Sequence, residues 1–191
     1  IRATGGKAFS YTTDLSKPDE AKKLAEDILR DHGHVDVLIN NAGRSIRRSI
    51  SLSVNRFHDF ERTMAINYLG PVQLVLALLP SMQARKQGHI VNISTWGVRM
   101  PPGARWSAYQ ASKGAFDTWL RSVALEIKAD GITTTSIYPA IVYTRMSAPT
   151  PGMHSLPVMN TDEAAHVIEL AAVEKPSEIT PQWLHSWKIA S

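Results

Sequence analysis

The sequence predicts an α/β fold in which helices cover both faces of a parallel β-sheet. Short apolar or β-branched runs alternate with longer stretches of helical spacing, which is typical of parallel sheets with crossover helices. The length of 191 residues suits one domain with a good core, and 43% hydrophobic and 20% charged residues are ordinary globular values. No repeat or low-complexity run divides the chain, so we expect a single domain over residues 1–191.

The first expected elements are a short strand at residues 8–13 and a helix that begins at Lys17. Ser16 is a candidate N-cap, because a serine hydroxyl can accept a hydrogen bond from a free N–H of the first turn. Acidic residues follow in that turn, where they interact favourably with the helix dipole. The apolar positions keep helical spacing and stop before Gly33, where the helix is expected to end.

A buried strand is expected at residues 35–39, and a long helical region over 56–86. A bend is expected near Gly70 and Pro71, because proline removes a backbone donor. The later elements, in chain order, are a strand at 89–94, a loop at 100–105, a helix to about Ala129 closed by Gly131, a strand at 132–138, a loop at 145–158, a helix at 161–172, and a tail after Pro176 without a clear pattern.

The composition excludes several kinds of site. The chain has no cysteine, which rules out disulfides and thiolate metal sites and agrees with a reducing cytoplasm. Its seven histidines lack metal-ligand spacing, so no metal is expected. The longest apolar stretch, residues 74–79, is far below the about 20 residues that span a bilayer, so no transmembrane segment is expected. The net charge of +4 is mild, and no basic stripe with aromatics suggests a nucleic-acid partner.

The most informative chemistry lies in Tyr109 and Lys113, four residues apart on an expected helix. A phenol loses its proton near pH ~10, too reluctantly for proton transfer at neutral pH. An ammonium one turn away favours the phenolate, so Lys113 is expected to lower the pKa of Tyr109. The pair predicts an acid/base group beside a cation, as needed where a cofactor moves a hydride.

Further motifs accompany this pair, and the turn Asn40-Asn41-Ala42-Gly43 at the end of an apolar strand is the rarest of them. In chain order they are Asp14 after an extended run, that turn, a helical Asn67, Val91-Asn92-Ile93-Ser94-Thr95, Tyr109-x-x-x-Lys113, and Pro139 followed by Val142 and Thr144. Their order and spacing resemble the short-chain dehydrogenase/reductase family over nearly the whole chain. The resemblance implies a doubly wound, Rossmann-like sheet and an NAD(P)(H)-dependent oxidoreductase.

The resemblance also implies a role for each matching residue. Tyr109 is the general acid/base, Lys113 holds the nicotinamide ribose, and Asn67 holds a water in a proton relay behind the lysine. Ala140 departs from the family, which often carries glycine after the proline. The other implied cofactor contacts are Asp14 and Leu15 at the adenine, Asn40, Asn41, Ala42 and Gly43 under the adenosine, and Pro139, Val142 and Thr144 at the nicotinamide.

The hydroxyl that assists Tyr109 has two candidates. In the family a serine or threonine usually lies thirteen residues before the tyrosine, but here that position is Trp96. The strand register instead places Thr95 at the catalytic position, with one extra residue in the loop Pro101-Pro102-Gly103. Ser94 is the alternative. Thr95 is preferred because a loop absorbs an insertion more readily than a strand absorbs a slip in register.

Segments between the motifs resemble one branch of the family, the bacterial long-chain fatty acyl-CoA reductases, which use NADPH to reduce an acyl thioester to an aldehyde. Arg44, Arg47 and Arg48 could then bind the phosphates of CoA, and the alternative is a solvated basic loop. NADP(H) is accordingly favoured over NAD(H). The runner-up is a same-fold oxidoreductase of another alcohol or ketone. The segments are Arg44-Ser45-Ile46-Arg47-Arg48, residues 57–64, Asn67-Tyr68-Leu69-Gly70 and Ser136-Ile137-Tyr138-Pro139.

The family opens with a strand, a Thr-Gly-x-x-x-Gly-x-Gly turn and a helix, and nothing in this chain matches that unit. We therefore expect an N-terminally truncated domain, in which the strands at 8–13 and 35–39 lack neighbours in the family's strand order 3-2-1-4-5-6-7. A non-enzyme alternative follows, because a chain without the pyrophosphate-binding turn could be an inactive fragment.

The complete protein is expected to be a homo-oligomer acting on a small-molecule substrate. In similar proteins the helix that carries Tyr109 and the long helix before it pack against their copies across a two-fold axis. The Tyr109 helix carries more apolar surface than one sheet face needs, at Ala108, Ala111, Ala115, Phe116, Trp119 and Val123.

Overall fold

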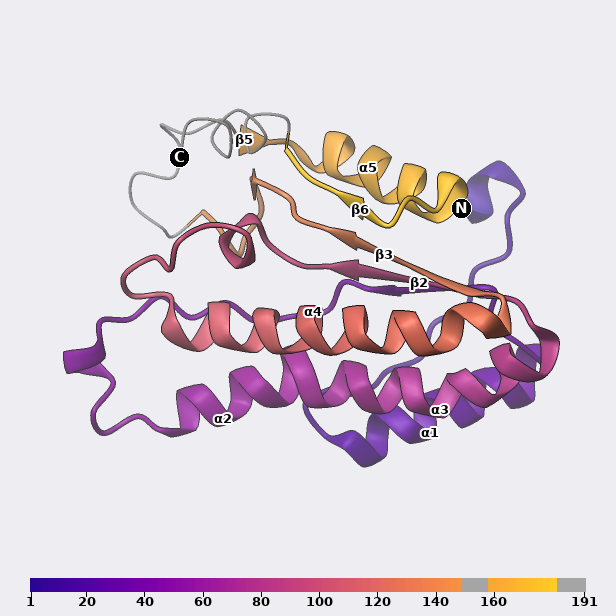
Figure 1. Ribbon diagram of the computed structural model, residues 1–191, viewed down its shortest axis with the longest axis horizontal. Coiled ribbons are helices and arrows are strands. Elements are labelled where there is room, and N and C mark those ends of the chain that lie inside the picture. Colours follow the sequence, from indigo (N-terminus) through magenta and orange to yellow (C-terminus); the bar gives the residue numbers. More distant parts are fainter. Residues whose placement is uncertain (149–157, 182–191) are drawn as a thin grey trace.

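The computed structural model describes residues 1–148 and 158–181 and shows a parallel sheet between layers of helices (Figure 1). All pairings within the main sheet are parallel. The predicted α/β class with a doubly wound parallel sheet is therefore confirmed. The main sheet has the order β1-β2-β3-β6, with β1 at Val37–Asn40, β2 at Gly88–Ile93, β3 at Ile132–Ile137 and β6 at Glu178–Ile179.

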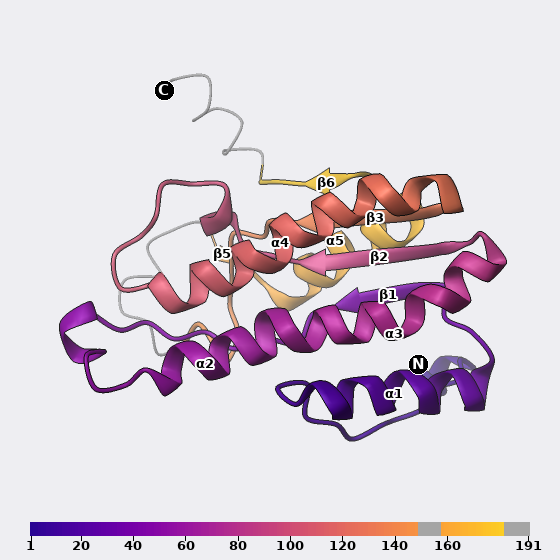
Figure 2. The same ribbon diagram turned by 60° about the horizontal axis from the view of Figure 1, so that its bottom comes forward.

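Two groups of helices enclose the sheet (Figures 1 and 2). One face is covered by α3 (Gly70–Arg85) and α4 (Ser107–Ile127), with α1 (Pro18–His32) against α3 and β1. The other face is covered by α5 (Thr161–Glu174). This arrangement leaves the carboxyl ends of the strands facing the loops, where ligands bind in doubly wound folds.

The two faces of β2 explain the core. Ile90 packs with apolar residues of α3 and α4, whereas its neighbour Val91 packs with α5, because successive side chains of a strand point to opposite faces. Both residues are fully buried. Strands buried on both faces of a parallel sheet are typically rich in Val and Ile, and β2 combines such residues with the buried polar side chains of His89 and Asn92.

The long helical region is continuous from His58 to Arg85, as α2 (His58–Met64), a π-helical turn (Ala65–Leu69) and α3. A bend was expected near Gly70 and Pro71, and the helix is irregular just before them, where residues Ala65–Leu69 form the π-helical turn. Gly70 lies against the carbonyl oxygen of Leu15, which a Cβ would approach to 1.8 Å. Glycine is required there so that the chain before α1 can touch this helix.

The helix from His58 to Arg85 is long and apolar enough, by length and composition, to cross a membrane. The prediction from the short run 74–79 missed this, because helix length and not only the apolar run decides such a test. Within the fold, Leu74, Val75 and Leu78 of this helix are buried against α1, α4 and the sheet. A core helix of a folded domain has the same properties.

The predicted strand at residues 8–13 is wrong, because this segment forms no strand in the structure. It runs along α1 instead, where the Tyr11 hydroxyl donates to Asp31 at 2.9 Å and the Phe9 ring lies 4.5 Å from that of His32. A strand needs a partner for its backbone groups, and in the described residues none pairs with this segment or with the outer edge of β1.

Other local predictions are also corrected. Ser16 does not cap α1; its backbone N–H and hydroxyl donate to the Asp14 carboxylate at 3.0 and 2.7 Å, and the N-cap is Lys17 without a side-chain hydrogen bond. Three two-residue strands were missed because such short pairings leave no periodic pattern. They are β4 (Ile141–Val142), β5 (Val158–Met159), which pairs with β4, and β6 in the tail after Pro176; residues 149–157 of the expected loop at 145–158 lie outside the described residues.

Hydrogen exchange is expected to distinguish residues 8–13, which lie outside the sheet, from the paired strand β2. Amides of residues 8–13 should exchange nearly as fast as in an unfolded peptide, whereas those of Ile90 and Val91 should be strongly protected, because only the latter lie in paired, buried strands. Joining a strand–glycine-rich turn–helix–strand unit ahead of residue 8 should protect that segment as well. Strong protection at residues 8–13 in the 191-residue monomer would refute this expectation.

His89 should make the fold sensitive to acid. Its ring is fully buried between β2, β3 and α5, with nitrogens 2.8 Å from the Thr133 hydroxyl and 3.0 Å from the Ala171 carbonyl. Burial lowers its pKa from 6.5. The unfolded chain then binds a proton that the folded chain resists, so the free energy of unfolding should fall as pH drops below about 6.5, until the folded pKa is reached.

Urea unfolding at several pH values checks this, with His89→Gln compared with His166→Gln, whose side chain is exposed on α5. The His89 variant should lose part of the acid dependence and the His166 variant should keep it. Identical pH dependence in all three proteins would exclude a role for His89.

Candidate active site

A cavity of about 970 Å³ opens at the carboxyl ends of β1, β2 and β3. One wall is the turn after β1 and the first turns of α4, and the opposite wall is α5 with the segment after β3. Its lining is largely apolar with a few polar groups, as in small-molecule sites. Of the predicted residues, the cavity brings together Asn41, Ala42, Gly43, Ser94, Thr95, Tyr109, Lys113, Pro139, Val142 and Thr144.

Tyr109 lies in the first turn of α4, partly buried in the cavity wall. Burial raises the pKa of the phenol above 10.0, and a hydrogen bond with the Thr95 side chain acts in the opposite direction. The prediction that Lys113 lowers this pKa is therefore wrong for this structure. Removing the phenolate from water is the larger effect, and the hydrogen-bonding neighbour is the threonine.

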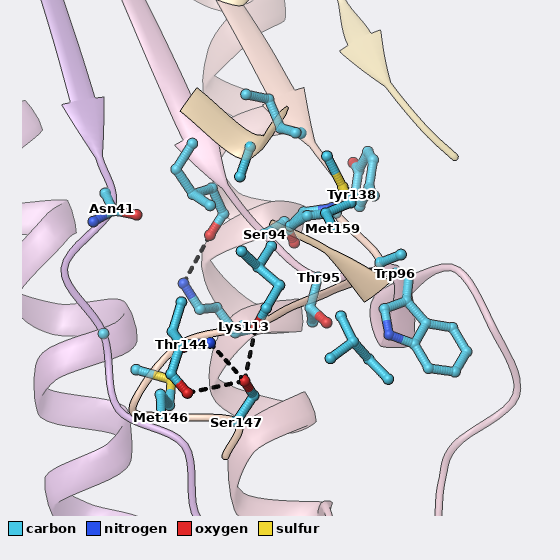
Figure 3. Close-up of a pocket in the computed structure, with 18 of the residues that line it drawn as sticks. Asn41, Ser94, Thr95, Trp96, Lys113, Tyr138, Thr144, Met146, Ser147 and Met159 are labelled. Carbon is cyan, nitrogen blue, oxygen red and sulfur yellow. Dashed lines mark hydrogen bonds between the residues drawn. The ribbon is translucent and has the colours of Figure 1, made fainter. Parts of the chain in front are cut away.

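Lys113 follows one turn later and is buried, with only 8% of its surface exposed. Its ammonium donates to the carbonyl oxygen of Ile93 at 2.8 Å (Figure 3). Burial lowers its pKa to about 8, because a charged amine is costly away from water. Such a buried cation beside a cavity is typical of functional sites.

Asn67 connects the site to the fold behind it. The side chain is buried in the π-helical turn, and its amide both accepts from Arg44 N–H and donates to Arg44 C=O, each at 2.8 Å. It also donates to the Ser112 hydroxyl on α4 at 2.9 Å. A Cβ on Gly43 would lie 3.0 Å from the Asn67 oxygen and 3.4 Å from the Lys113 amine. The surface-amide interpretation of Asn67 is thus excluded, and Gly43 allows these groups to meet.

Thr95 and Ser94 have different surroundings. The Thr95 side chain caps the short 3₁₀-helix Trp96–Val98 by accepting from Gly97 N–H at 3.4 Å, and it is the hydroxyl that bonds Tyr109. Ser94 also lines the cavity, but its buried hydroxyl has no hydrogen-bond partner among the described residues. The geometry favours Thr95 beside Tyr109 and leaves the Ser94 hydroxyl available to a ligand.

Three predicted cofactor contacts lie outside the cavity wall. Asp14 is exposed in the loop before α1, with its carboxylate accepting from Ser16. Leu15 packs against the α1–α3 core, and its carbonyl faces Gly70. Asn40 ends β1 with its side-chain nitrogen buried and unpartnered among the described residues.

The segment after β3 closes the cavity from the other side. Pro139 accepts a hydrogen bond from Trp96 N–H at 3.1 Å, which ties the ends of β2 and β3 together. The Ser147 hydroxyl accepts from Thr144 N–H at 2.9 Å and donates to Val142 C=O at 2.7 Å (Figure 3). These bonds hold the predicted residues Val142 and Thr144 against the cavity.

Sequence reasoning missed much of the apolar lining. Tyr138 is fully buried, with its hydroxyl donating to Asp117 of α4 at 2.7 Å and the Arg99 guanidinium 4.3 Å from its ring centre. Tyr138 was named only as part of a segment that resembles the acyl-CoA reductase branch, and no motif marked Asp117 or Arg99, because only folding brings these three residues together. The other missed lining residues include Trp96, Trp106, Met146, Met159, Ala164, Ala165 and Ile168.

The sheet, the cavity at its carboxyl ends and the Tyr109–Lys113 pair define a Rossmann-like oxidoreductase fold. The family model for short chain dehydrogenases matches residues 1–154, and the chain belongs to that family. It is 45% identical to a fatty acyl-CoA reductase of Acinetobacter baylyi over 191 residues, which is 100% of this chain and 63% of that protein. It is 41% identical to a fatty acyl-CoA reductase of Mycobacterium tuberculosis over 182 residues, 95% of this chain and 62% of that protein.

A solved structure shows the same fold. A metagenomic short-chain oxidoreductase in complex with NADP superposes with a TM-score of 0.77 at 29% identity, covering 95% of this chain and 77% of that one. The chain spans less than two thirds of the length of each of the two fatty acyl-CoA reductases named above.

Proposed function

We propose that the protein is an NAD(P)(H)-dependent oxidoreductase that reduces a fatty acyl-CoA thioester to an aldehyde. The observation that carries this proposal is the placement of Tyr109, Thr95 and Lys113 at one large, mostly apolar cavity. The first relative described above carries the name of this activity and matches the chain throughout. The family and the site support the reaction type, and the relatives support the substrate.

The site residues fit a nicotinamide dinucleotide. The cavity lies at the carboxyl ends of the strands, and Asn41, Ala42 and Gly43 form its wall at β1. The Lys113 amine, which donates to Ile93 C=O in this structure, is proposed to donate to the sugar hydroxyls of the cofactor. The buried Ser94 hydroxyl without a partner among the described residues also fits a polar ligand. When bound, the cofactor supplies the hydride. NADP(H) is proposed over NAD(H), because the similar structure contains NADP and the resembling reductases use NADPH.

The chain's own groups then handle the proton. Thr95 and Tyr109 hold the thioester carbonyl oxygen, and Tyr109 gives that oxygen a proton as the carbonyl carbon gains the hydride. The resulting hemithioacetal returns its hydroxyl proton to Tyr109 and expels CoA as the thiolate, which takes a proton from water, leaving the aldehyde. Lys113 holds the ribose of the cofactor beside Tyr109, and Asn67 keeps the wall behind Lys113 in place.

The arginines near the cavity contribute unequally to the proposed substrate recognition. Arg48 is bound to the buried Asp59, with 3.1 Å between Nε and the carboxylate, so it has little freedom to bind CoA. Arg44 lines the cavity and Arg47 is exposed nearby. We therefore assign CoA phosphate binding to Arg44 and Arg47 rather than to all three arginines.

NADPH consumption with a long-chain acyl-CoA tests the proposal, with aldehyde and free CoA measured by mass spectrometry. Equal amounts of both products are expected, and Arg44→Ala should raise KM for acyl-CoA with little change for a free aldehyde. NADPH consumption only with a ketone or hydroxysteroid would establish the alternative substrate class. Failure to bind NADPH at all would contradict the proposed function.

The protein is also proposed to form a homo-oligomer through α4, which carries Tyr109, and the long helix before it, which ends in α3. Phe116 is buried in the core, and Trp119 and Val123 pack against that core. The apolar surface of α4 that is left for a second copy is therefore smaller than the sequence suggested. Leu76 of α3 and Leu125 of α4 nevertheless remain exposed. Light scattering should show a dimer or tetramer at micromolar concentration. A monomer would refute the assembly.

A further inference from the structure

A protruding loop between β1 and α2 exposes four large apolar side chains. They are Ile50, Leu52, Val54 and Phe57, with 71%, 67%, 77% and 71% of their surfaces exposed, and they are called the apolar tip below. Figures 1 and 2 show this loop extending beyond the end of α2, away from the sheet. Scattered exposed apolar residues are ordinary, but four within eight residues of a protrusion indicate an interaction site.

The apolar tip is held by its own hydrogen bonds. Ile50–Leu52 form a 3₁₀-helix, and the Ser53 hydroxyl donates to Ser49 C=O at 3.0 Å. Arg56 N–H donates to Ser53 C=O at 2.9 Å, which fixes the return into α2. The exposed side chains therefore belong to an ordered turn.

Arginines surround the base of the apolar tip. One buried carboxylate, that of Asp59, binds Arg48 at 3.1 Å and Arg56 at 3.0 Å, and it also binds Arg62. The side chains of Arg56 and Arg62 stay 40% exposed, and Arg47 is exposed in the segment before the apolar tip. Residues 44–62 hold five arginines against Asp59 and Glu61, a formal net charge of +3. Asp59 thus holds three arginines, which lie beside the apolar tip in the sequence, close to one another.

We propose that the apolar tip and its arginines dock on the surface of an anionic lipid bilayer. Apolar side chains that enter the boundary between headgroups and acyl chains, with basic residues at the phosphate level, are the usual chemistry of interfacial binding. A second copy of the chain fits less well, because pairing two such tips across a two-fold axis would bring their arginines together. The docking is peripheral and requires no spanning helix.

The docking surface lies next to the cavity. Arg44 and Ser45, just before the tip, line the cavity, and Arg48 N–H donates at 2.8 Å to the carbonyl of Arg105, next to the cavity residue Trp106. The loop between β1 and α2 and the loop before α4 lie at the same end of the molecule in Figures 1 and 2. If the proposed function holds, docking here places the cavity mouth where long acyl chains partition. Vesicle binding itself does not depend on that function.

Vesicle flotation of the purified protein tests the docking. Wild type should float with phosphatidylcholine vesicles that contain phosphatidylglycerol, and much less with phosphatidylcholine alone. Arg47→Glu should weaken binding more than about fivefold, since each basic side chain at an anionic surface contributes ~1 kcal/mol. Ile50→Ser combined with Val54→Ser and Phe57→Ser should weaken it by roughly tenfold or more, through lost apolar insertion.

Two control variants make changes of the same kind at exposed positions away from the apolar tip. Val173→Ser removes an exposed apolar side chain from α5, and Lys128→Glu reverses an exposed charge after α4; both should float like wild type. Circular dichroism verifies that all variants fold. Wild type that stays unbound to anionic vesicles overturns the proposal, as does equal flotation of the triple variant. Light scattering that shows the triple variant changing a dimer into a monomer, without any vesicle binding by wild type, assigns the tip to a second copy instead.

Discussion

Replacing Tyr109 with phenylalanine is expected to reduce turnover by ~10²–10⁴-fold or more, while NADPH binding largely survives. The change removes only the phenolic hydroxyl, so the lost contribution is proton transfer. The ring stays in the cavity wall, where it is partly buried. Steady-state kinetics and NADPH fluorescence titration measure the two quantities separately. A variant that keeps more than about a tenth of the wild-type rate would contradict the assignment.

Two alanine variants serve as the comparison. Thr95→Ala removes the hydroxyl that bonds Tyr109, whereas Ser94→Ala removes a buried hydroxyl without a partner among the described residues. Thr95→Ala is expected to lower turnover more. The reverse order would move the catalytic role to Ser94 and show that the extra residue lies in the strand rather than in the loop.

Lys113→Met is expected to inactivate the enzyme and yet stabilise the fold. Burial lowers the folded pKa of this lysine from 10.5 to about 8, so at pH 7 the charged amine costs up to about 3 kcal/mol relative to the unfolded chain. Methionine fills similar space without a charge. Part of the gain is offset, because the amine's hydrogen bond to Ile93 is lost. Chemical denaturation and steady-state kinetics of the same samples measure both effects.

The pH dependence provides the check. Because the folded pKa lies below the unfolded one, the cost of Lys113 is present in full below about pH 8 and disappears as pH rises toward 10.5. The stability difference between variant and wild type should shrink over that window. A difference that is independent of pH would attribute the effect to packing. Stability equal to wild type together with full loss of activity would remove the electrostatic explanation altogether.

The sequence predicted those parts of the fold that depend on local patterns. The β-branched residues of β2 and the helical spacing of α1 and α4 are patterns among neighbouring residues. The predicted ends of these three elements were therefore correct within one or two residues. The prediction of a strand at residues 8–13 was wrong because it relied on the local pattern alone. The alternation of this segment is compatible with a strand, but strand formation also needs a partner, which consecutive residues cannot reveal.

The candidate site divides in the same way. The Tyr-x-x-x-Lys motif identified Tyr109 and Lys113, and the strand register favoured Thr95 over Ser94. The structure places all of these residues at one cavity. The direction of the Tyr109 pKa shift was not predictable, because the burial of the phenol depends on which distant segments cover it. Arg48 shows the same limit, since its partner Asp59 is eleven residues away and becomes buried only in the folded chain.

By itself, the sequence determined the order of the longer helices and strands and the family, and it indicated the residues of the candidate site, because each of these depends on patterns among residues a few positions apart. The tertiary structure decided which groups are buried, which charges are paired and which apolar side chains stay exposed at residues 50–57. These properties depend on segments far apart in the chain that exclude water from one another. Exclusion of water sets the pKa of Lys113 and fixes the arginines around Asp59, so the acid–base and binding properties of this protein arise only on folding.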